Sequence, residues 1–159
     1  ATAINLYAVA QRVAGRLSSF ADDQGVRVRV EGASACIAGS ETLAEEMLYN
    51  LIENGIRYNH EGGLVTMKVG SECVEGGLAN AAYQTVVRVS DTGPGIPAEL
   101  HDKVFERFFR VDKSRSKETG GTGLGLAIVK HAVMYHGGVI EVESAEGQGT
   151  TFVLRFPSA

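Results

Sequence analysis

Hydrophobic residues recur at three- and four-residue spacing in three segments of the chain, and this spacing predicts three helices. The segments cover residues 5–21, 42–60 and 124–135. Ser40 or Thr42 can cap the second helix, because both residues carry a side-chain oxygen that accepts from free amides at a helix start.

Six further segments either alternate apolar and polar residues or form short apolar runs, which predicts strands. They are residues 26–30, 36–38, 64–69, 85–90, 139–144 and 151–156. We expect residues 70–84 to form a long, glycine-containing hairpin loop. Strands and helices mix without a regular βαβ alternation. This predicts an α+β fold, a two-layer sandwich of one mostly antiparallel sheet with helices on one face.

The pattern changes after the strand at 85–90. Pro97 can open a short helix that runs to about Phe105, and residues 109–123 lack periodicity and are expected to form a mobile loop. Six of the fifteen Lys and Arg residues lie within fifteen positions: Lys103, Arg107, Arg110, Lys113, Arg115 and Lys117. Taken alone, this run is either a solvated face or a cationic binding segment.

Composition excludes several classes of protein. A chain of 159 residues is expected to form one domain with its own core, and its net charge of -4 argues against general nucleic-acid binding. No apolar run approaches the ~20 residues of a membrane helix, and the start of the chain does not resemble a signal peptide. Cys36 and Cys73 stand alone, and the four histidines form no metal-binding motif. The 20 glycines make up about one residue in eight, which exceeds the average glycine frequency of about 7%. This excess indicates close approach of the backbone to a ligand.

One side of the second predicted helix is polar. At about 100° per residue, its members are Glu46, Asn50, Asn54 and Arg57, with Tyr58 at the margin. Two asparagines at this spacing are unusual, because asparagine is a poor helix former. Their amide oxygens suit Mg²⁺ held alongside phosphate, and a guanidinium suits phosphate itself. For the helix alone, a polar face exposed to water is the simpler interpretation. The opposite side is expected to face the sheet through Ala44, Leu48, Leu51, Ile52 and Gly55.

Asp91 follows a predicted strand and opens the turn DTGPGIP at residues 91–97. Its carboxylate can accept a hydrogen bond from an exocyclic amine, such as the 6-amino group of adenine. Gly93 and Gly95 allow positive φ and let the backbone approach a flat ring. Asp-Gly turns are common in loops, so this motif carries little weight alone.

Glycines also crowd residues 120–126, where the third predicted helix begins. Free N–H groups and the helix dipole suit phosphate at such a position. The stretch fits neither a Walker A loop nor a Rossmann fingerprint. A glycine-rich cap and linker explains one or two of these glycines but not four in six positions. Together with Asp91 and the two asparagines, the stretch indicates ATP.

Five motifs, in the family's order over residues 46–152, give the chain a specific resemblance to sensor histidine kinases. They resemble the N box (50–58), the G1 box (91–95), the F box (104–112), the G2 box (121–126) and the glycine-threonine signature (147–150). The stretch 105–131 further resembles phosphate-regulon (PhoR-like) sensor kinases.

The resemblance implies the Bergerat (GHKL) ATP-binding fold. That fold is a mixed, mostly antiparallel sheet of about five strands with three helices on one face and a flexible lid. The resemblance identifies residues 1–159 as a single ATP-binding catalytic domain. Its N-box helix is expected at 42–60, its G1 turn at 91–97, and its F box, lid and G2 box at 104–125.

The resemblance also implies residue roles. Asn50 and Asn54 would hold Mg²⁺ on the triphosphate, and Arg57 and Arg110 would contact phosphate; these four are the expected catalytic residues. Asp91 would bind the adenine amine. The other expected nucleotide-binding residues are Tyr58, Gly93, Gly95, Ile96, Gly121, Thr122, Gly123, Leu124, Gly125, Leu126 and Thr150. The F-box phenylalanines either belong to the core or anchor the lid and contact the phosphate-accepting domain: Phe105, Phe108 and Phe109.

The phosphoacceptor histidine of these kinases lies in a helical motif of the form SHELRTPL, which none of the four histidines matches. We therefore expect a protein histidine kinase catalytic domain whose phosphoacceptor dimerisation helices, on the same kinase, are absent from this sequence. A response regulator would act through the full-length protein. The domain is expected to be the cytoplasmic part of a membrane-anchored bacterial sensor, with no membrane or nucleic-acid contact of its own.

Two alternatives stay open. One is another GHKL enzyme, either an anti-sigma-factor serine kinase or a gyrase/Hsp90-like ATPase. In the ATPases a catalytic Glu occupies the position of Asn50, so the amide counts against them and hydrolysis by this domain alone is expected to be slow. The F box and the long basic lid count against the anti-sigma kinases. The other alternative is a non-catalytic nucleotide-sensing module that has kept its motifs.

Overall fold

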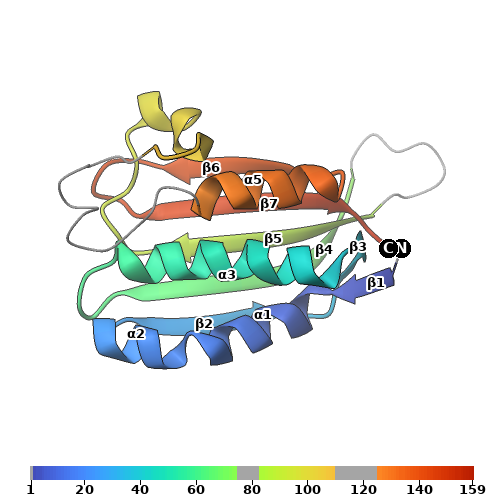
Figure 1. Cartoon of the computed structure of the whole chain (residues 1–159), viewed down its shortest axis with the longest axis horizontal. Coiled ribbons are helices and arrows are strands. Elements are labelled where there is room, and N and C mark those ends of the chain that lie inside the picture. Colours follow the sequence, from blue (N-terminus) through green and yellow to red (C-terminus); the bar gives the residue numbers. More distant parts are fainter. Residues whose placement is uncertain (1, 75–82, 110–124) are drawn as a thin grey trace.

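A five-stranded sheet forms one layer of the fold, and helices cover one of its faces (Figure 1). The computed structural model describes residues 2–74, 83–109 and 125–159. The strand order is β2-β4-β5-β7-β6, in which β2 and β4 are parallel and the other neighbours antiparallel. The strands are β2 (Arg27–Gly32), β4 (Leu64–Cys73), β5 (Tyr83–Asp91), β6 (Val139–Ser144) and β7 (Thr150–Pro157). The mixed, mostly antiparallel sheet confirms the expected fold class.

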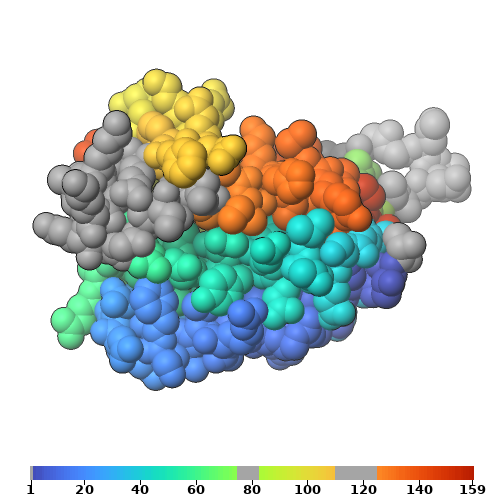
Figure 2. All heavy atoms as spheres, viewed as in Figure 1, coloured from blue at the N-terminus to red at the C-terminus, as the bar shows by residue number. Residues whose placement is uncertain are grey.

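The helix layer consists of α1 (Leu6–Arg16), α2 (Ser18–Gln24), α3 (Glu41–Arg57) and α5 (Gly125–Tyr135). Figure 2 shows the atoms of α1 and α2, of α3 and of α5 as neighbouring blue, teal and orange bands on one face, with the yellow segment around residue 100 next to α5. The single helix expected over 5–21 is wrong in two respects, because it breaks at Leu17 and continues to Gln24. The Ser18 hydroxyl donates to the carbonyl of Gly15 at 2.9 Å and so competes with the helical backbone at the break.

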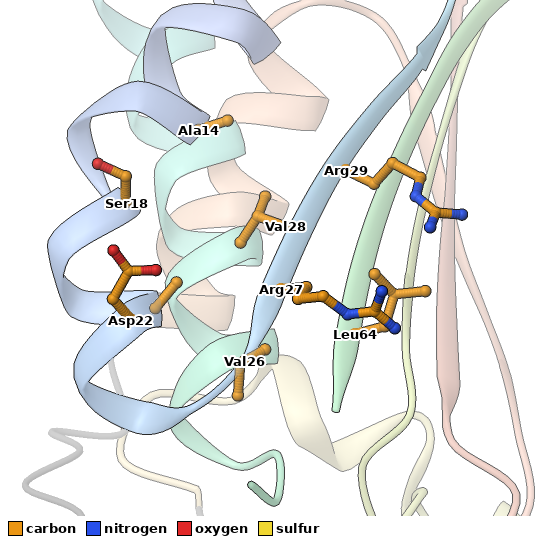
Figure 3. A pocket seen from close by; sticks show the side chains of 9 residues that line it. Ala14, Ser18, Asp22, Val26, Arg27, Val28, Arg29 and Leu64 are labelled. Atoms are coloured by element: carbon orange, nitrogen blue, oxygen red, sulfur yellow. The ribbon is translucent and has the colours of Figure 1, made fainter. Parts of the chain in front are cut away.

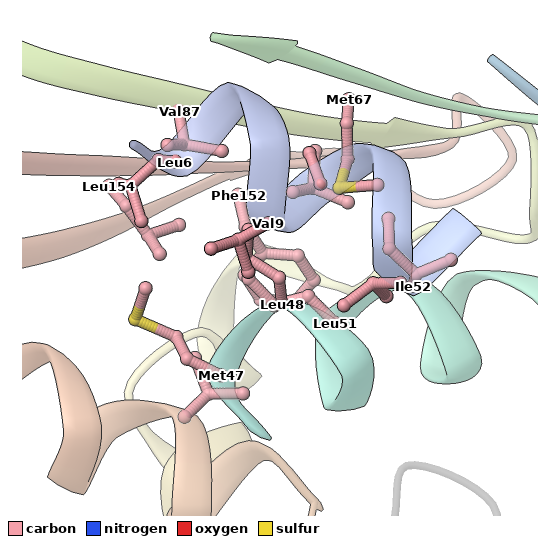
Figure 4. Close-up of a cluster of buried hydrophobic side chains, with 14 of the residues drawn as sticks. Leu6, Val9, Met47, Leu48, Leu51, Ile52, Met67, Val87, Phe152 and Leu154 are labelled. Atoms are coloured by element: carbon pink, nitrogen blue, oxygen red, sulfur yellow. The ribbon is translucent and has the colours of Figure 1, made fainter. Parts of the chain in front are cut away.

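The hydrophobic core lies between the helices and the sheet (Figure 4). Leu48 and Ile52 of α3 and Phe152 of β7 are among its buried side chains. The side of α3 expected to face the sheet is buried throughout, since Ala44, Leu48, Leu51, Ile52 and Gly55 are all inaccessible. Because burial of apolar surface stabilises a fold by roughly 25 cal/mol per Å², this side fixes the orientation of α3 and turns its polar stripe outward.

A second, two-stranded sheet joins β1 (Thr2–Asn5) to β3 (Cys36–Gly39) in antiparallel register. Alternation along the sequence does not predict β1, because its pairing partner lies more than thirty residues away. The expected loop over 70–84 is partly wrong, because β4 and β5 extend into it and pair up to Cys73 and Tyr83. Residues 75–82 lie outside the described residues.

The short helix expected from Pro97 to Phe105 is two 3-10 turns instead, Ala98–Leu100 and Lys103–Phe105. Backbone bonds from Leu100 to Pro97 and from Glu106 to Lys103 close turns of three residues rather than an α-helix. At the other end of the domain, Gly137 takes a φ of 69° just after α5, as expected of a residue that ends a helix.

A buried histidine connects α5 to the start of α3. His136 is 8% exposed; its Nδ1 donates to the carbonyl of Ala132 at 2.7 Å, and its Nε2 accepts from the amide of Ser40 at 3.1 Å. Ser40 is also the residue that caps α3, because its hydroxyl accepts from the amide of Leu43. Ser40 rather than Thr42 is therefore the cap, and His136 fixes its backbone.

We predict that His136→Ala lowers the free energy of unfolding by about 2–4 kcal/mol, because it leaves a cavity and removes two buried hydrogen bonds. Chemical denaturation of both proteins measures the difference. His131→Ala is the matched control on the exposed side of α5 and should cost less than about 0.5 kcal/mol. Equal losses in the two variants would contradict the role of His136.

Candidate functional site

The polar stripe of α3 borders the first turn of α5. The Nδ2 of Asn50 donates to the carbonyl of Glu46 at 2.8 Å, and this bond turns Oδ1 outward. A Cβ added to Gly125 would lie 3.2 Å from that oxygen, so Asn50 and the start of α5 face each other. The amide oxygen that could bind a cation therefore points toward the helix start that could bind phosphate.

Asn54 and Arg57 lie one and two turns further along α3. Both side chains are half-buried, and within the described part of the chain Asn54 makes no side-chain hydrogen bond. Arg57 differs, because its Nε binds Oε1 of Glu53 at 2.7 Å and its guanidinium lies 5.3 Å from the ring centroid of Phe20. The structure thus places Asn54 beside Asn50 on the stripe and links Arg57 to α2.

Asp91 lies at the end of β5, opposite Thr150 of β7 and close to α3. Its Oδ1 accepts from the amide of Gly93 at 2.9 Å, and the amide of Thr150 also donates to it. Burial raises the pKa of Asp91 to about 6, and the two amide hydrogen bonds offset only part of this effect. The group is therefore a largely desolvated acceptor, and no cationic side chain among the described residues pairs with it.

Glycines allow close backbone contacts at Asp91 and in the turn after β5. A Cβ on Gly149 would overlap the backbone oxygen of Asp91, and one on Gly95 would overlap the backbone oxygen of Ala145. Both glycines have a φ of 77°, which L-residues rarely adopt. A Cβ on Gly93 would lie 3.2 Å from the backbone oxygen of Tyr58, so the turn after β5 also touches the end of α3.

Two residues that sequence reasoning missed support the turn after β5. The Ser144 hydroxyl accepts from the amide of Ile96 at 2.7 Å, and the Nε2 of His101 donates to the carbonyl of Ile96 at 2.9 Å. Ile96 is 9% exposed, so its backbone groups need partners inside the protein. A serine at the end of a strand carries no pattern that would have revealed this role.

The F-box phenylalanines divide between the core and the surface. Phe105 meets Phe152 edge-on at 6.1 Å, and Phe109 packs against the core. Phe108 is 60% exposed with a φ of 64°, and the guanidinium of Arg107 lies 5.2 Å from its ring centroid. The core interpretation therefore holds for two of the three rings, and Phe108 faces solvent.

Several expected site residues lie outside the described residues: Arg110, Gly121, Thr122, Gly123 and Leu124. Of the expected phosphate-binding stretch, the structure describes Gly125 and Leu126, in the first turn of α5. Leu126 is half-buried and packs against the core.

A groove of ≈360 Å³ lies away from these residues, between α1, α2 and the start of β2 (Figure 3). None of the expected site residues lines it. Figure 3 shows Arg27 and Arg29 on the far side of β2 from Val28, which faces the helices. The groove is therefore distinct from the candidate site.

Nowhere in residues 2–74, 83–109 and 125–159 do three or more His, Cys, Asp or Glu side chains gather as a metal site. Within the same residues, none of the helices combines the length and the apolar character needed to cross a membrane.

Residues 39–159 match the family described as histidine kinase-, DNA gyrase B-, and HSP90-like ATPase. Sensor-like histidine kinase SenX3 of Mycobacterium tuberculosis is 37% identical over 158 residues, which are 99% of this chain and 36% of SenX3. Sensor protein IrlS of Burkholderia pseudomallei is 41% identical over 151 residues, which are 95% of this chain and 30% of IrlS. The chain thus spans about a third of the length of these relatives.

Solved structures agree with this similarity. The mycobacterial sensor histidine kinase MprB superposes with a TM-score of 0.80 at 26% identity, over 99% of this chain and 97% of the other. The catalytic domain of histidine kinase ThkA, in a nucleotide-free form, gives a TM-score of 0.78 at 26% identity, over 98% of this chain and 94% of the ThkA chain. Full-length ShkA in complex with AMPPNP gives 0.78 at 28% identity, over 99% of this chain and 31% of ShkA.

We predict that Asp91→Asn stabilises the ligand-free protein at pH 8. The raised pKa of Asp91 means that the folded state holds the proton more tightly than the unfolded chain, so the fold loses stability as the pH rises from about 4 to about 6, and the loss is complete above that pH. A neutral amide avoids this cost, which is up to about 3 kcal/mol. The gain should shrink as the pH falls through 6 and vanish near pH 4.

Thermal unfolding of the wild type and Asp91→Asn between pH 4 and pH 8 measures the effect. Asp23→Asn, at an exposed position of α2, is the matched control and should give no such gain. A difference between Asp91→Asn and the wild type that stays constant over this range would show that burial of the charge is not its cause.

Proposed function

We propose that this chain, which belongs to the family of histidine kinase-, DNA gyrase B- and HSP90-like ATPases, binds Mg²⁺-ATP between α3, the turn after β5 and α5. The chain is the ATP-binding catalytic domain of a sensor histidine kinase. It then transfers the γ-phosphate to a histidine of a separate helical domain. The observation that carries the proposal is Asp91, a half-buried carboxylate that has no cationic partner among the described residues and lies beside Gly93 and Gly149, where a side chain would crowd it.

Asp91 would bind the base. An ionised carboxylate accepts hydrogen bonds only, so it suits the 6-amino group of adenine. Gly93, Gly95 and Ile96 of the turn after β5 would form one wall of the base pocket. Thr150 lies opposite Asp91 in the sheet, and Tyr58 caps the C-terminal end of α3 next to this turn. These contacts come from three elements, which supports a preformed base pocket rather than an incidental turn.

The triphosphate would lie between α3 and the first turn of α5. The outward oxygen of Asn50 and the amide of Asn54 can each contribute a neutral oxygen ligand, and phosphate oxygens would complete the coordination of Mg²⁺. This division of ligands fits a site in which the described residues supply no acidic cluster. Bound Mg²⁺ would supply charge neutralisation for phosphoryl transfer.

The amides of residues 121–125 and the guanidinium of Arg110 would contact the phosphates. Arg57 would also contact phosphate, and its interactions with Glu53 and Phe20 hold the guanidinium at the end of α3. Glu53 and Phe20 are both half-buried and belong to α3 and α2, respectively.

The chemistry is an in-line displacement at the γ-phosphorus. An imidazole nitrogen of the partner domain forms the new P–N bond, the bond to the β–γ bridging oxygen breaks, and ADP leaves. Asn50 can neither take a proton from water nor orient it as a carboxylate would, so ATP hydrolysis without the partner domain should be slow. The proton of the imidazole would go to a group outside this chain.

The partner domain would consist of the dimerisation helices of the same kinase, and a response regulator would receive the phosphoryl group from them. Exposed Phe108 and the cationic Arg107 beside it would belong to the surface that meets these helices. The full-length protein would be a membrane-anchored sensor with this domain in the cytoplasm.

The experiment that tests the proposal mixes the domain with radiolabelled ATP, Mg²⁺ and a separately prepared dimerisation domain. We expect acid-labile, base-stable phosphate on the partner, as a phosphohistidine requires. Asp91→Asn should bind ATP at least 100-fold more weakly by calorimetry, because a donor replaces an acceptor, yet it should remain folded. ATP binding without any transfer would favour a nucleotide-sensing module, and unchanged affinity in Asp91→Asn would refute the base pocket.

A separate prediction concerns the metal. Asn54→Ala should weaken ATP binding by about tenfold when Mg²⁺ is present, because one oxygen ligand is lost. Calorimetry in Mg²⁺ and in EDTA separates this effect from a general loss of binding. Glu46→Ala, on the exposed part of the same stripe, should change neither value. An equal loss in EDTA would exclude the metal role of Asn54.

A further inference from the structure

The hydroxyl group of Ser144, the last residue of β6, has every hydrogen-bonding position occupied. It accepts from the amide of Ile96 at 2.7 Å, donates to the carbonyl of Gly149 at 2.8 Å, and lies 2.9 Å from the hydroxyl of Thr150. A hydroxyl has one proton and two acceptor sites, so three partners saturate it.

The direction of each bond follows from the chemistry of the partners. The amide of Ile96 can only donate, and the carbonyl of Gly149 can only accept, so the single proton of Ser144 goes to Gly149. Gly149 is buried, and a buried carbonyl without a partner costs about 1–3 kcal/mol, which favours this arrangement. Between the two hydroxyls, Thr150 must therefore be the donor and Ser144 the acceptor.

This direction determines what Thr150 can offer to a ligand. Its proton is engaged with Ser144, so its hydroxyl oxygen has only acceptor capacity left. Thr150 is 6% exposed and stands directly opposite Asp91 in the β5–β7 register. Its backbone amide already donates to the Asp91 carboxylate. Both side chains at this point of the pocket are therefore acceptors.

A second acceptor matters because a carboxylate alone does not identify adenine. Adenine offers a 6-amino group, whereas hypoxanthine and guanine carry a 6-carbonyl beside an N1–H that a carboxylate can also accept. An additional acceptor next to the carboxylate favours an amine, which has two protons to donate, and opposes a carbonyl oxygen. A hydroxyl that was free to rotate would accept from one and donate to the other.

We propose that Ser144 is a specificity-determining positioning residue, which fixes the hydroxyl proton of Thr150 and so makes the base pocket select 6-aminopurine over 6-oxopurine nucleotides. The inference rests on the proposed function, because it assumes that the base lies beside Asp91. Ser144 does not touch the nucleotide in this proposal and acts through Thr150.

Calorimetric titration with ATP and with ITP, its 6-oxo counterpart, tests the proposal. In Ser144→Ala the Thr150 hydroxyl is free to donate to the 6-carbonyl, so the ratio of ATP to ITP affinity should fall by about tenfold, the effect of one hydrogen bond. A purely structural role would weaken both nucleotides equally and leave the ratio unchanged, which would overturn the proposal.

Ser90→Ala is the matched control. Ser90 and Thr151 form a 2.9 Å hydroxyl pair one position along the same end of the sheet, on its opposite face. This variant should keep the wild-type ratio, and a ratio that fell as far as in Ser144→Ala would overturn the proposal.

Thr150→Val tests whether the Thr150 hydroxyl selects 6-aminopurine nucleotides, and it does so without altering Ser144. This variant serves as the test of the proposal if Ser144→Ala does not fold. Removing the hydroxyl should weaken ATP binding but not ITP binding, so the ratio should fall here too; an unchanged ratio overturns the proposal. A wild-type protein that binds neither nucleotide refutes the proposed function itself. A wild type that binds ATP, with ratios unaltered in both variants, refutes this inference alone.

Discussion

The arrangement of the site depends on one half-buried carboxylate. Asp91 is desolvated, and two backbone amides are what holds its charge inside the protein. A side chain on Gly149 would strike the backbone oxygen of Asp91, and a Cβ added to Gly55 of α3 would lie 3.6 Å from the Cβ of Asp91, so both glycines let the neighbouring elements approach this residue. Burial disfavours the charge of Asp91 and raises its pKa, so a hydrogen-bond donor that approached the carboxylate would stabilise its ionised form.

Helix α3 positions the site because three of its sides contact other elements: the sheet, α5 and α1. Its apolar side is buried against the sheet, and its polar stripe meets α5. Its remaining side faces α1, where Arg12 pairs with Glu41 and Arg16 with Glu45, each at 2.8 Å. Exposed ion pairs of this kind contribute at most about 1 kcal/mol each. The buried side therefore determines where Asn50 lies, and the ion pairs add little to its position.

Sequence reasoning succeeded where the signal is local. The periodicity of α3 predicted both its buried side and its polar stripe, because each depends on residues within a few turns. It failed where distant residues decide the structure. At the break at Leu17, the Ser18 hydroxyl binds the carbonyl of Gly15, and the role of Ser144 depends on an amide 48 positions earlier in the chain. No spacing rule connects Ser144 to Ile96, since the sheet register brings them together only after folding.

The contact between His136 and Ser40 has a mechanical consequence. It ties the last turn of α5 to the N-cap of α3, at the opposite end of α5 from Gly125. Gly125 in turn approaches Asn50, so the eleven residues of α5 are held against α3 near both of their ends. Because the helix is rigid between these two contacts, a change of packing at His136 would also shift the first turn of α5 relative to Asn50.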